Sequence, residues 1–161
     1  VDNGQWSVLS TIHYPLSTDM IIGYGNPLRG DDGVGWRVIE ALEGLVPEGA
    51  AVAVHLLTPE LAEPISRARI VVFVDAAVGD LPGQVRCFSL LPAPARPGSH
   101  ETNPAGLLAL AAELFGRCPP AHMVTIAGGS FEVGEELTAP VEAAVAVAAA
   151  AVRALVHHAD G

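Results

Sequence analysis

The chain has 161 residues, half of them hydrophobic, which is enough for one domain with a substantial core. Its formal net charge is −10 and its eight strong bases are all arginine, so binding to nucleic acid or to an anionic membrane is not expected. The two cysteines, Cys87 and Cys118, have neither the number nor the spacing of a disulfide framework or a zinc ribbon, which favours a reduced, cytoplasmic location.

Residues 1–18 are predicted to form a polar N-terminal extension, and residues 19–158 a single α/β domain. No lysine or arginine precedes Arg29, so the beginning of the chain lacks the positively charged region of a secretory signal. The most apolar stretch, 143–152, is too short and too rich in alanine to span a bilayer. No membrane segment is therefore expected.

Apolar runs alternate with helical patterns along residues 19–158. Strands are predicted at 20–24, 51–57, 70–75, 84–90 and 121–127, of which 70–75 is a mostly β-branched run and 84–90 alternates like an edge strand. Helices are predicted at 32–45, from 58 to 68, at 104–115 with Thr102 or Asn103 as its cap, and at 138–156. This alternation predicts a three-layer α/β/α fold in which helices flank a central, twisted, mostly parallel sheet.

The first predicted strand ends in a glycine-rich turn that carries two adjacent carboxylates. The turn reads Gly23-Tyr-Gly-Asn26, and Asp31 and Asp32 follow it before two more glycines. Glycine lets the backbone approach a ligand closely and adopt positive φ without strain. Neighbouring carboxylates repel each other unless backbone N–H groups, water or a cation offsets their charge. The turn therefore predicts a functional site, most simply a metal site, in which Asn26 holds the turn or hydrogen-bonds a carbonyl group.

A dinucleotide-binding turn is the nearest alternative interpretation of these glycines. That motif needs a third glycine where this chain has Leu28, and acidic side chains stand where a pyrophosphate would meet the helix N-terminus. A phosphate loop with its lysine is excluded, as are Schiff-base and Ser-Lys mechanisms, because the chain has no lysine. The stretch 128–132 lacks the last glycine of a serine nucleophile elbow.

Two further candidate ligands follow later in the chain. Asp75 ends the predicted strand 70–75, and His100 lies in a loop just before a helix. Taken singly, each has a structural explanation, as a turn residue or an exposed side chain, and Asp32 could cap a helix. Because ligands of parallel sheets bind beyond the carboxyl ends of the strands, we expect the three to converge. Two oxygen ligands and one nitrogen ligand suit nickel, zinc or manganese, and they leave positions open for a substrate carbonyl or water.

In their order and spacing these residues resemble the hydrogenase maturation proteases. The resemblance rests on Gly23-Tyr-Gly-Asn26, Asp31-Asp32, Val74-Asp75-Ala, Ser99-His100 and the stretch Ser130–Pro140 that enters the last helix. It covers nearly all of the chain from Met20 to Val156. Members of this family are endopeptidases that remove the C-terminal extension of the [NiFe]-hydrogenase large subunit.

The resemblance implies an aspartic-type endopeptidase activity that activates another enzyme by processing it. It implies an α/β fold, a monomer, and a large-subunit precursor as partner. It also implies that the functional nickel is carried by the substrate, so that only a loaded precursor is cut. Zinc or another divalent ion is expected to occupy the same site in vitro.

The resemblance also assigns roles to individual residues. It implies that Asp32, Asp75 and His100 are both the metal ligands and the catalytic residues. The surrounding loop positions, which support the ligands without binding metal, are Gly23, Gly25, Asn26 and Asp31. The chain departs from the family in its long polar N-terminus and in Pro27 and Arg29, and none of these is a predicted ligand.

Two other classes of function stay open at this point. The same three ligands would serve a nickel- or zinc-binding assembly chaperone that holds the precursor without cutting it. A nucleotide-binding α/β protein is the second alternative, although Leu28 and the acidic loop weaken it.

Overall fold

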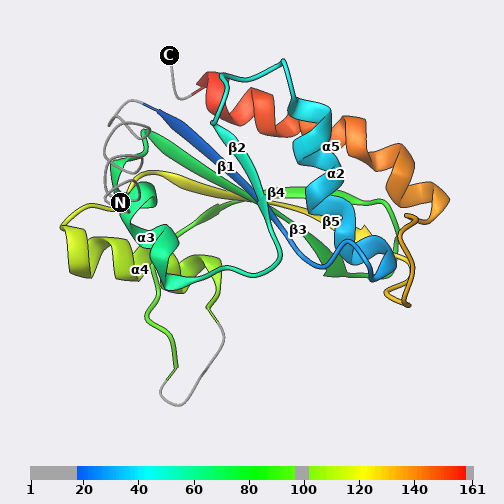
Figure 1. The fold of residues 1–161 in the computed structure, drawn as a ribbon, viewed down its shortest axis with the longest axis horizontal. Helices are drawn as coiled ribbons and strands as arrows, with labels where there is room; N and C mark the ends of the chain where they lie inside the picture. The colour runs from blue at the N-terminus through cyan, green and yellow to red at the C-terminus, as the bar shows by residue number, and fades with distance from the viewer. Residues whose placement is uncertain (1–17, 97–101, 159–161) are drawn as a thin grey trace, which may run out of the picture.

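The computed structural model describes residues 18–96 and 102–158, and it places a five-stranded sheet between two layers of helices (Figure 1). The strands are β1 (Asp19–Tyr24), β2 (Ala51–Val54), β3 (Ile70–Val78), β4 (Val85–Leu90) and β5 (Ala121–Gly128). The α-helices are α2 (Val34–Leu42), α3 (Ala62–Arg67), α4 (Pro104–Phe115) and α5 (Ala139–His158), and the 3-10 turns are η1 (Gly30–Gly33) and η2 (Pro59–Leu61).

The strand order is β2-β1-β3-β5-β4, and only β4 runs antiparallel to its neighbour. This confirms the predicted three-layer fold with a mostly parallel sheet, and it places the predicted edge strand at an edge. Because β1, β3 and β5 run in one direction, their carboxyl ends meet at the same end of the sheet. The loops that follow them are therefore neighbours in space.

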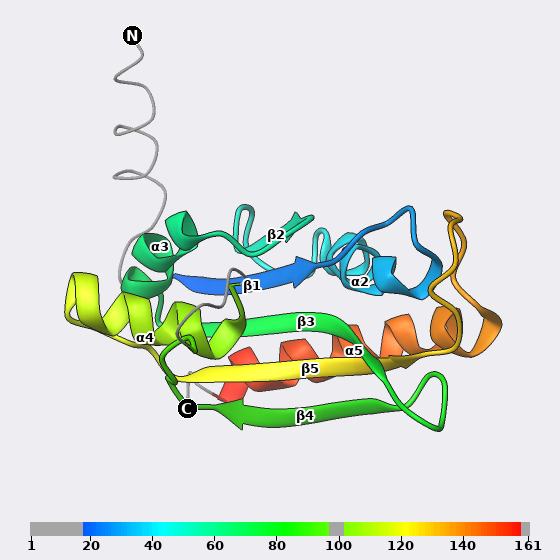
Figure 2. The ribbon, with the colours of Figure 1, turned by 90° about the horizontal axis from the view of Figure 1, so that it is seen from below.

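Each face of the sheet has its own apolar core. Helices α2 and α5 cover one face, where they pack on Val72, Val74 and Ile126. Helices α3 and α4 lie on the opposite face against Phe73 and Met123 (Figure 2). Successive side chains of a strand point to opposite faces, so the odd-numbered residues of β3, including Asp75, face the α3/α4 side.

Helix α5 is long and apolar enough to cross a membrane by length and composition alone. A core helix of a soluble protein passes the same test, and one face of α5 packs against the sheet. The buried side chains on that face are Val141, Ala144, Val145, Ala148, Ala149, Val152 and Val156.

Several element boundaries differ from those predicted. The helix predicted from Asp32 to Leu45 begins with the 3-10 turn η1 and ends at Leu42. Strand β2 ends at Val54 instead of residue 57, whereas β3 continues past Asp75 to Val78 because its ladder with β5 extends that far. Helix α4 has the predicted bounds, and the Asn103 side chain caps it by accepting a hydrogen bond from the Gly106 N–H at 2.7 Å.

Two glycines let α2 lie unusually close to the sheet. A β-carbon on Gly23 would collide with the carbonyl oxygen of Gly35 and lie 2.7 Å from Ile39 Cγ1. A β-carbon on Gly35 would lie 2.8 Å from the Val74 oxygen and 2.9 Å from the Tyr24 nitrogen. The N-terminal turn of α2 is therefore pressed against the ends of β1 and β3, where the site lies.

We expect Gly23→Ala to lower the free energy of unfolding by about 2–3 kcal/mol, because the added methyl group must push α2 away from β1. Gly44→Ala is the matched control. A β-carbon there meets nothing within 4 Å, so only the strain of a φ of 79° remains, at about 1 kcal/mol. Urea denaturation followed by circular dichroism measures both, and equal losses would contradict close helix–strand packing.

Candidate functional site

The loop after β1 is held by its own polar groups. Asn26 Oδ1 accepts a hydrogen bond from the Leu28 N–H at 2.9 Å, so this side chain stabilises the turn. The Asn26 N–H donates to Asp32 Oδ2 at 2.7 Å. Gly25 has φ of 136°, and a β-carbon there would collide with the Asp32 carbonyl oxygen. The turn thus places the Asp32 carboxylate directly over the end of β1.

Asp31 is fully buried and has a structural role. Its carboxylate accepts hydrogen bonds from the backbone N–H groups of Gly129, Ser130 and Thr138 and from the Thr138 hydroxyl, at 2.7–3.0 Å. Burial alone would raise the pKa of Asp31, but these hydrogen bonds outweigh it and lower the pKa below its ordinary value. Asp31 therefore joins its own loop to a second loop.

Backbone hydrogen bonds join the same two loops. The Gly30 N–H donates to the Gly134 oxygen at 2.8 Å, and the Gly134 N–H donates to the Leu28 oxygen at 2.8 Å. The Asp31 N–H donates to the Ser130 oxygen at 2.9 Å. The segment 129–138, which the sequence resemblance includes, is thus a brace for the loop that carries Asp32.

Asp75 lies beside Tyr24 where β1 and β3 run side by side. The Tyr24 hydroxyl donates a hydrogen bond to the Asp75 carboxylate, and the Ala76 N–H donates to Asp75 Oδ1 at 2.7 Å. Burial raises the pKa of Asp75 to about 7, and the nearby charge of Asp32 adds to the rise while the two hydrogen bonds oppose it. Burial and the charge of Asp75 also raise the pKa of Tyr24, so its hydroxyl keeps its proton.

The structure brings together two of the three predicted ligands. Asp32 comes from the 3-10 turn η1 and Asp75 from strand β3, and they are close enough for the charge of Asp32 to shift the pKa of Asp75. His100 lies outside the described residues. Within residues 18–96 and 102–158, no three His, Cys, Asp or Glu side chains gather closely enough to hold a metal ion. The assignment of His100 as third ligand stays a prediction.

Tyr24 is a site residue that the sequence interpretation missed. It lies inside the glycine-rich turn that drew attention to the loop, between Gly23 and Gly25. Tyr24 ends β1 and lies level with Asp75 on β3, because the register pairs Gly23 with Val74. The neighbour of β1 could not be identified from the sequence, however, so the contact with Asp75 was not foreseen.

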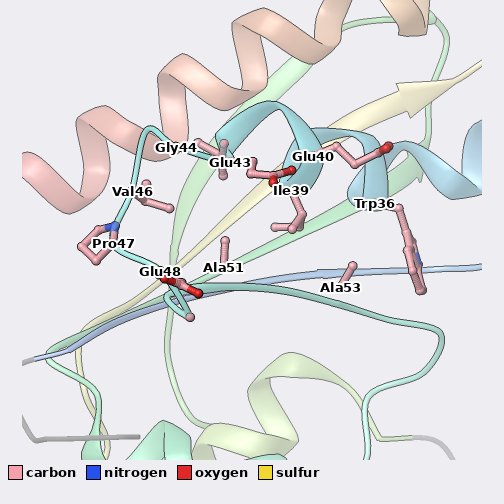
Figure 3. Close-up of a pocket in the computed structure, with 12 residues that line it drawn as sticks. Trp36, Ile39, Glu40, Glu43, Gly44, Val46, Pro47, Glu48, Ala51 and Ala53 are labelled. Carbon is pink, nitrogen blue, oxygen red and sulfur yellow. The ribbon is translucent and has the colours of Figure 1, made fainter.

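A hollow of about 630 Å³ lies elsewhere, between α2 and the edge strand β2 (Figure 3). Glu40, Glu43 and Glu48 line it together with apolar side chains, and neither Asp32 nor Asp75 reaches it. One of its lining residues, Trp36, is linked to the loop of the site, because its Nε1–H donates to the Gly25 oxygen at 2.9 Å. This hollow is therefore separate from the carboxylate pair.

The carboxylate pair defines what the site can do chemically. Two adjacent carboxyl groups offer the oxygen ligands that divalent cations accept, and a cation would offset their repulsion. A carboxyl group with a pKa near 7 can also exchange a proton with water at neutral pH. Both properties suit a site for metal-assisted hydrolysis.

Comparison with known proteins shows which fold surrounds this pair. No family model and no curated protein matches the chain. Among solved structures, a hydrogenase maturating endopeptidase HybD from E. coli is 23% identical with a TM-score of 0.69, over 88% of this chain and 93% of that one. A hydrogenase 2 maturation peptidase from Thaumarchaeota archaeon SCGC_AB-539-E09 is 24% identical with a TM-score of 0.66, over 88% of this chain and 99% of that one.

A third similar structure is a [NiFe] hydrogenase maturation protease HybD from Thermococcus kodakarensis. It is 24% identical with a TM-score of 0.66, over 86% of this chain and 98% of that one. The chain has the fold of the hydrogenase maturation endopeptidases. The expected α/β architecture is thereby confirmed over most of the length of these proteins.

We expect Asp31→Asn to lower the free energy of unfolding by about 2–4 kcal/mol, because an amide NH₂ would face buried N–H donors that the carboxylate now satisfies. Hydrogen exchange should quicken at the amides of Gly129, Ser130 and Thr138. Asp80→Asn, at an exposed position, is the control and should change stability by less than about 0.5 kcal/mol. Unchanged exchange at those three amides would contradict the bracing role of Asp31.

Proposed function

We propose that this protein is an endopeptidase that removes the C-terminal extension of a nickel-loaded [NiFe]-hydrogenase large-subunit precursor. The observation that carries the proposal is the meeting of Asp32, in η1, with Asp75, on β3 beside the carboxyl end of β1. They meet within a fold shared with proteins described as hydrogenase maturation endopeptidases. Residues chosen from the sequence for their chemistry thus lie together at the edge of the sheet where ligands of such folds bind.

In this proposal the nickel is part of the substrate. Asp32, Asp75 and His100 contact it and thereby test whether the metal has been installed. The scissile bond is held close to the metal, and either the nickel or a carboxylate activates the attacking water. Tyr24 keeps the Asp75 carboxylate oriented toward the metal by its hydrogen bond. Zinc or another divalent ion would take the place of nickel in vitro.

The acidic charge of the chain supports the rest of the proposal. With a net charge of −10, the protein is suited to a cytoplasmic protein substrate and not to nucleic acid or membrane. We propose that it acts as a monomer that meets the precursor directly.

We expect purified protein to release a C-terminal peptide from nickel-loaded precursor and to leave nickel-free precursor intact. Asp32→Asn, which keeps an oxygen acceptor for the Asn26 N–H but removes the charge, should lower the rate more than about 100-fold. His100→Ala should have a similar effect. Mass spectrometry of the precursor measures the loss.

Glu113→Gln, on the exposed surface of α4, is the control and should cut at the wild-type rate. Nickel-independent cutting would contradict the metal test, and normal cutting by Asp32→Asn would contradict the ligand assignment. A precursor that is bound but never shortened would favour an assembly chaperone. Thermal stabilisation by a nucleotide and not by a divalent metal would favour the nucleotide-binding alternative.

Tyr24→Phe should slow processing by about tenfold without abolishing it, because the variant keeps the ring but loses the hydrogen bond that orients Asp75. The affinity for a divalent ion such as zinc, measured by calorimetry, should fall by a similar factor. A variant that processes and binds zinc as well as the wild type would show that Tyr24 has no part in positioning Asp75.

A further inference from the structure

Helices α3 and α4 cover only part of their face of the sheet. Toward the carboxyl ends of β3 and β5 that face is left bare by both helices (Figure 2). A hollow of about 590 Å³ lies there, lined by residues of β3, β4 and β5 and of the turn between β3 and β4. We call this hollow the sheet-face groove, and the residues that matter for it are Ala77, Leu81, Arg86, Phe88, Thr125 and Ala127.

The groove begins next to Asp75. Asp75 pairs in register with Thr125 on β5, and Thr125 pairs in register with Arg86 on β4. Register partners share a face of the sheet, so Asp75, Thr125 and Arg86 form one row. Neighbouring strands lie about 4.8 Å apart, so about 10 Å separates Asp75 from Arg86 along this row. The groove is thus continuous with the candidate site.

Arg86 is a cation without a partner in the part of the chain that the structure describes. It is exposed, and no hydrogen bond or ion pair joins it to another described residue. Among the described residues that line the groove, Arg86 is the only basic one and Asp80 the only acidic one, in a protein with a net charge of −10. A guanidinium group is suited to bind a carboxylate with two parallel hydrogen bonds. The guanidinium group of Arg86 therefore favours an acidic ligand group beside it.

The rest of the groove has a mixed lining, in which Asp80, Gln84 and Thr125 are polar and the other side chains are apolar. Ala77 and Ala127 provide small side chains between Asp75 and the rim. Leu81 and Phe88 also line the groove, and they are 63% and 48% exposed. Exposed apolar side chains that lie together often mark a binding surface. Small side chains between exposed apolar ones leave space for a peptide in an extended conformation.

We propose that the sheet-face groove binds the C-terminal extension of the precursor, on the side of the scissile bond that is released. This inference rests on the proposed function. The mature side of the substrate carries the nickel and occupies the Asp32 and Asp75 end, so the extension leads away from the metal along the groove. At about 3.3 Å per extended residue, a span of about 10 Å corresponds to about three residues. Arg86 binds an acidic side chain of the extension about three residues after the cleaved bond.

Steady-state processing of nickel-loaded precursor tests this placement. Arg86→Gln should raise KM about tenfold and leave kcat unchanged, because a charged hydrogen bond far from the reacting atoms is lost. Arg153→Gln on α5, across the sheet from the groove, is the matched control and should leave both constants unchanged. Phe88→Ala should raise KM as well, and its exposed position should spare the fold.

Neutralising the acidic residue of the precursor provides the second arm. In wild-type protein this change should raise KM by the same factor as Arg86→Gln, and in the Arg86→Gln variant it should have no further effect. An extension without Asp or Glu at the second to fourth residue after the bond would overturn the proposal. Additive effects of the two changes would also overturn it.

Failure of this inference can be told from failure of the proposed function. If wild-type protein leaves nickel-loaded precursor uncut, the proposed function fails and the groove assignment fails with it. If wild type and Arg86→Gln cut with equal KM, only the groove assignment fails. If the groove instead joins two copies of the chain, analytical sedimentation should detect a dimer, and Arg86→Gln or Phe88→Ala should dissociate it. This result would also overturn the groove assignment.

Discussion

The buried carboxylate of Asp31 is the interaction on which the rest of the site depends. A buried charged group is stable only when hydrogen bonds from the protein replace those it loses to water. Three backbone N–H groups and the Thr138 hydroxyl supply these hydrogen bonds to Asp31. All four donors come from the segment 129–138, about a hundred residues further along the chain. One side chain therefore fixes the relative position of two loops, and Asp32, the next residue, takes its orientation from that arrangement.

Close backbone packing supplies the second constraint. Gly23 and Gly35 bring α2 against the end of β1, much as the glycines of a nucleotide-binding turn bring a helix close to a strand. A nucleotide-binding turn uses this proximity to present N–H groups to phosphate. In this protein the corresponding turn carries two carboxylates, and that of Asp31 accepts hydrogen bonds from backbone N–H groups of the segment 129–138. The close packing of helix and strand is thus the same as in a nucleotide-binding turn, but the turn carries negative charge and suits a cation instead of a phosphate.

The sequence was sufficient where local signals were strong. The β-branched run of β3, the Asn103 cap with its following proline, and the glycine-rich turn each specify a local conformation, so these elements could be predicted. The expectation that Asp32 and Asp75 converge rested instead on the general rule that ligands bind beyond the carboxyl ends of parallel strands. Strand order could not be predicted, because it depends on packing between distant segments. The contact of Tyr24 with Asp75 and the row from Asp75 to Arg86 follow from strand order and were therefore invisible in the sequence. The four donors to Asp31 were hidden for the same reason.

On the proposed function, the electrostatics of the pair explain why processing should wait for the metal. Burial and the neighbouring charge of Asp32 raise the pKa of Asp75 to about 7, so without a cation Asp75 is partly protonated at neutral pH and a weak ligand. A divalent ion that arrives with the substrate reverses this balance, because it favours both carboxylates in their charged form. Recognition of nickel and completion of the site would then be the same event. A precursor that lacks its metal would supply no positive charge to offset the repulsion between Asp32 and Asp75. The site around its scissile bond would then stay incomplete.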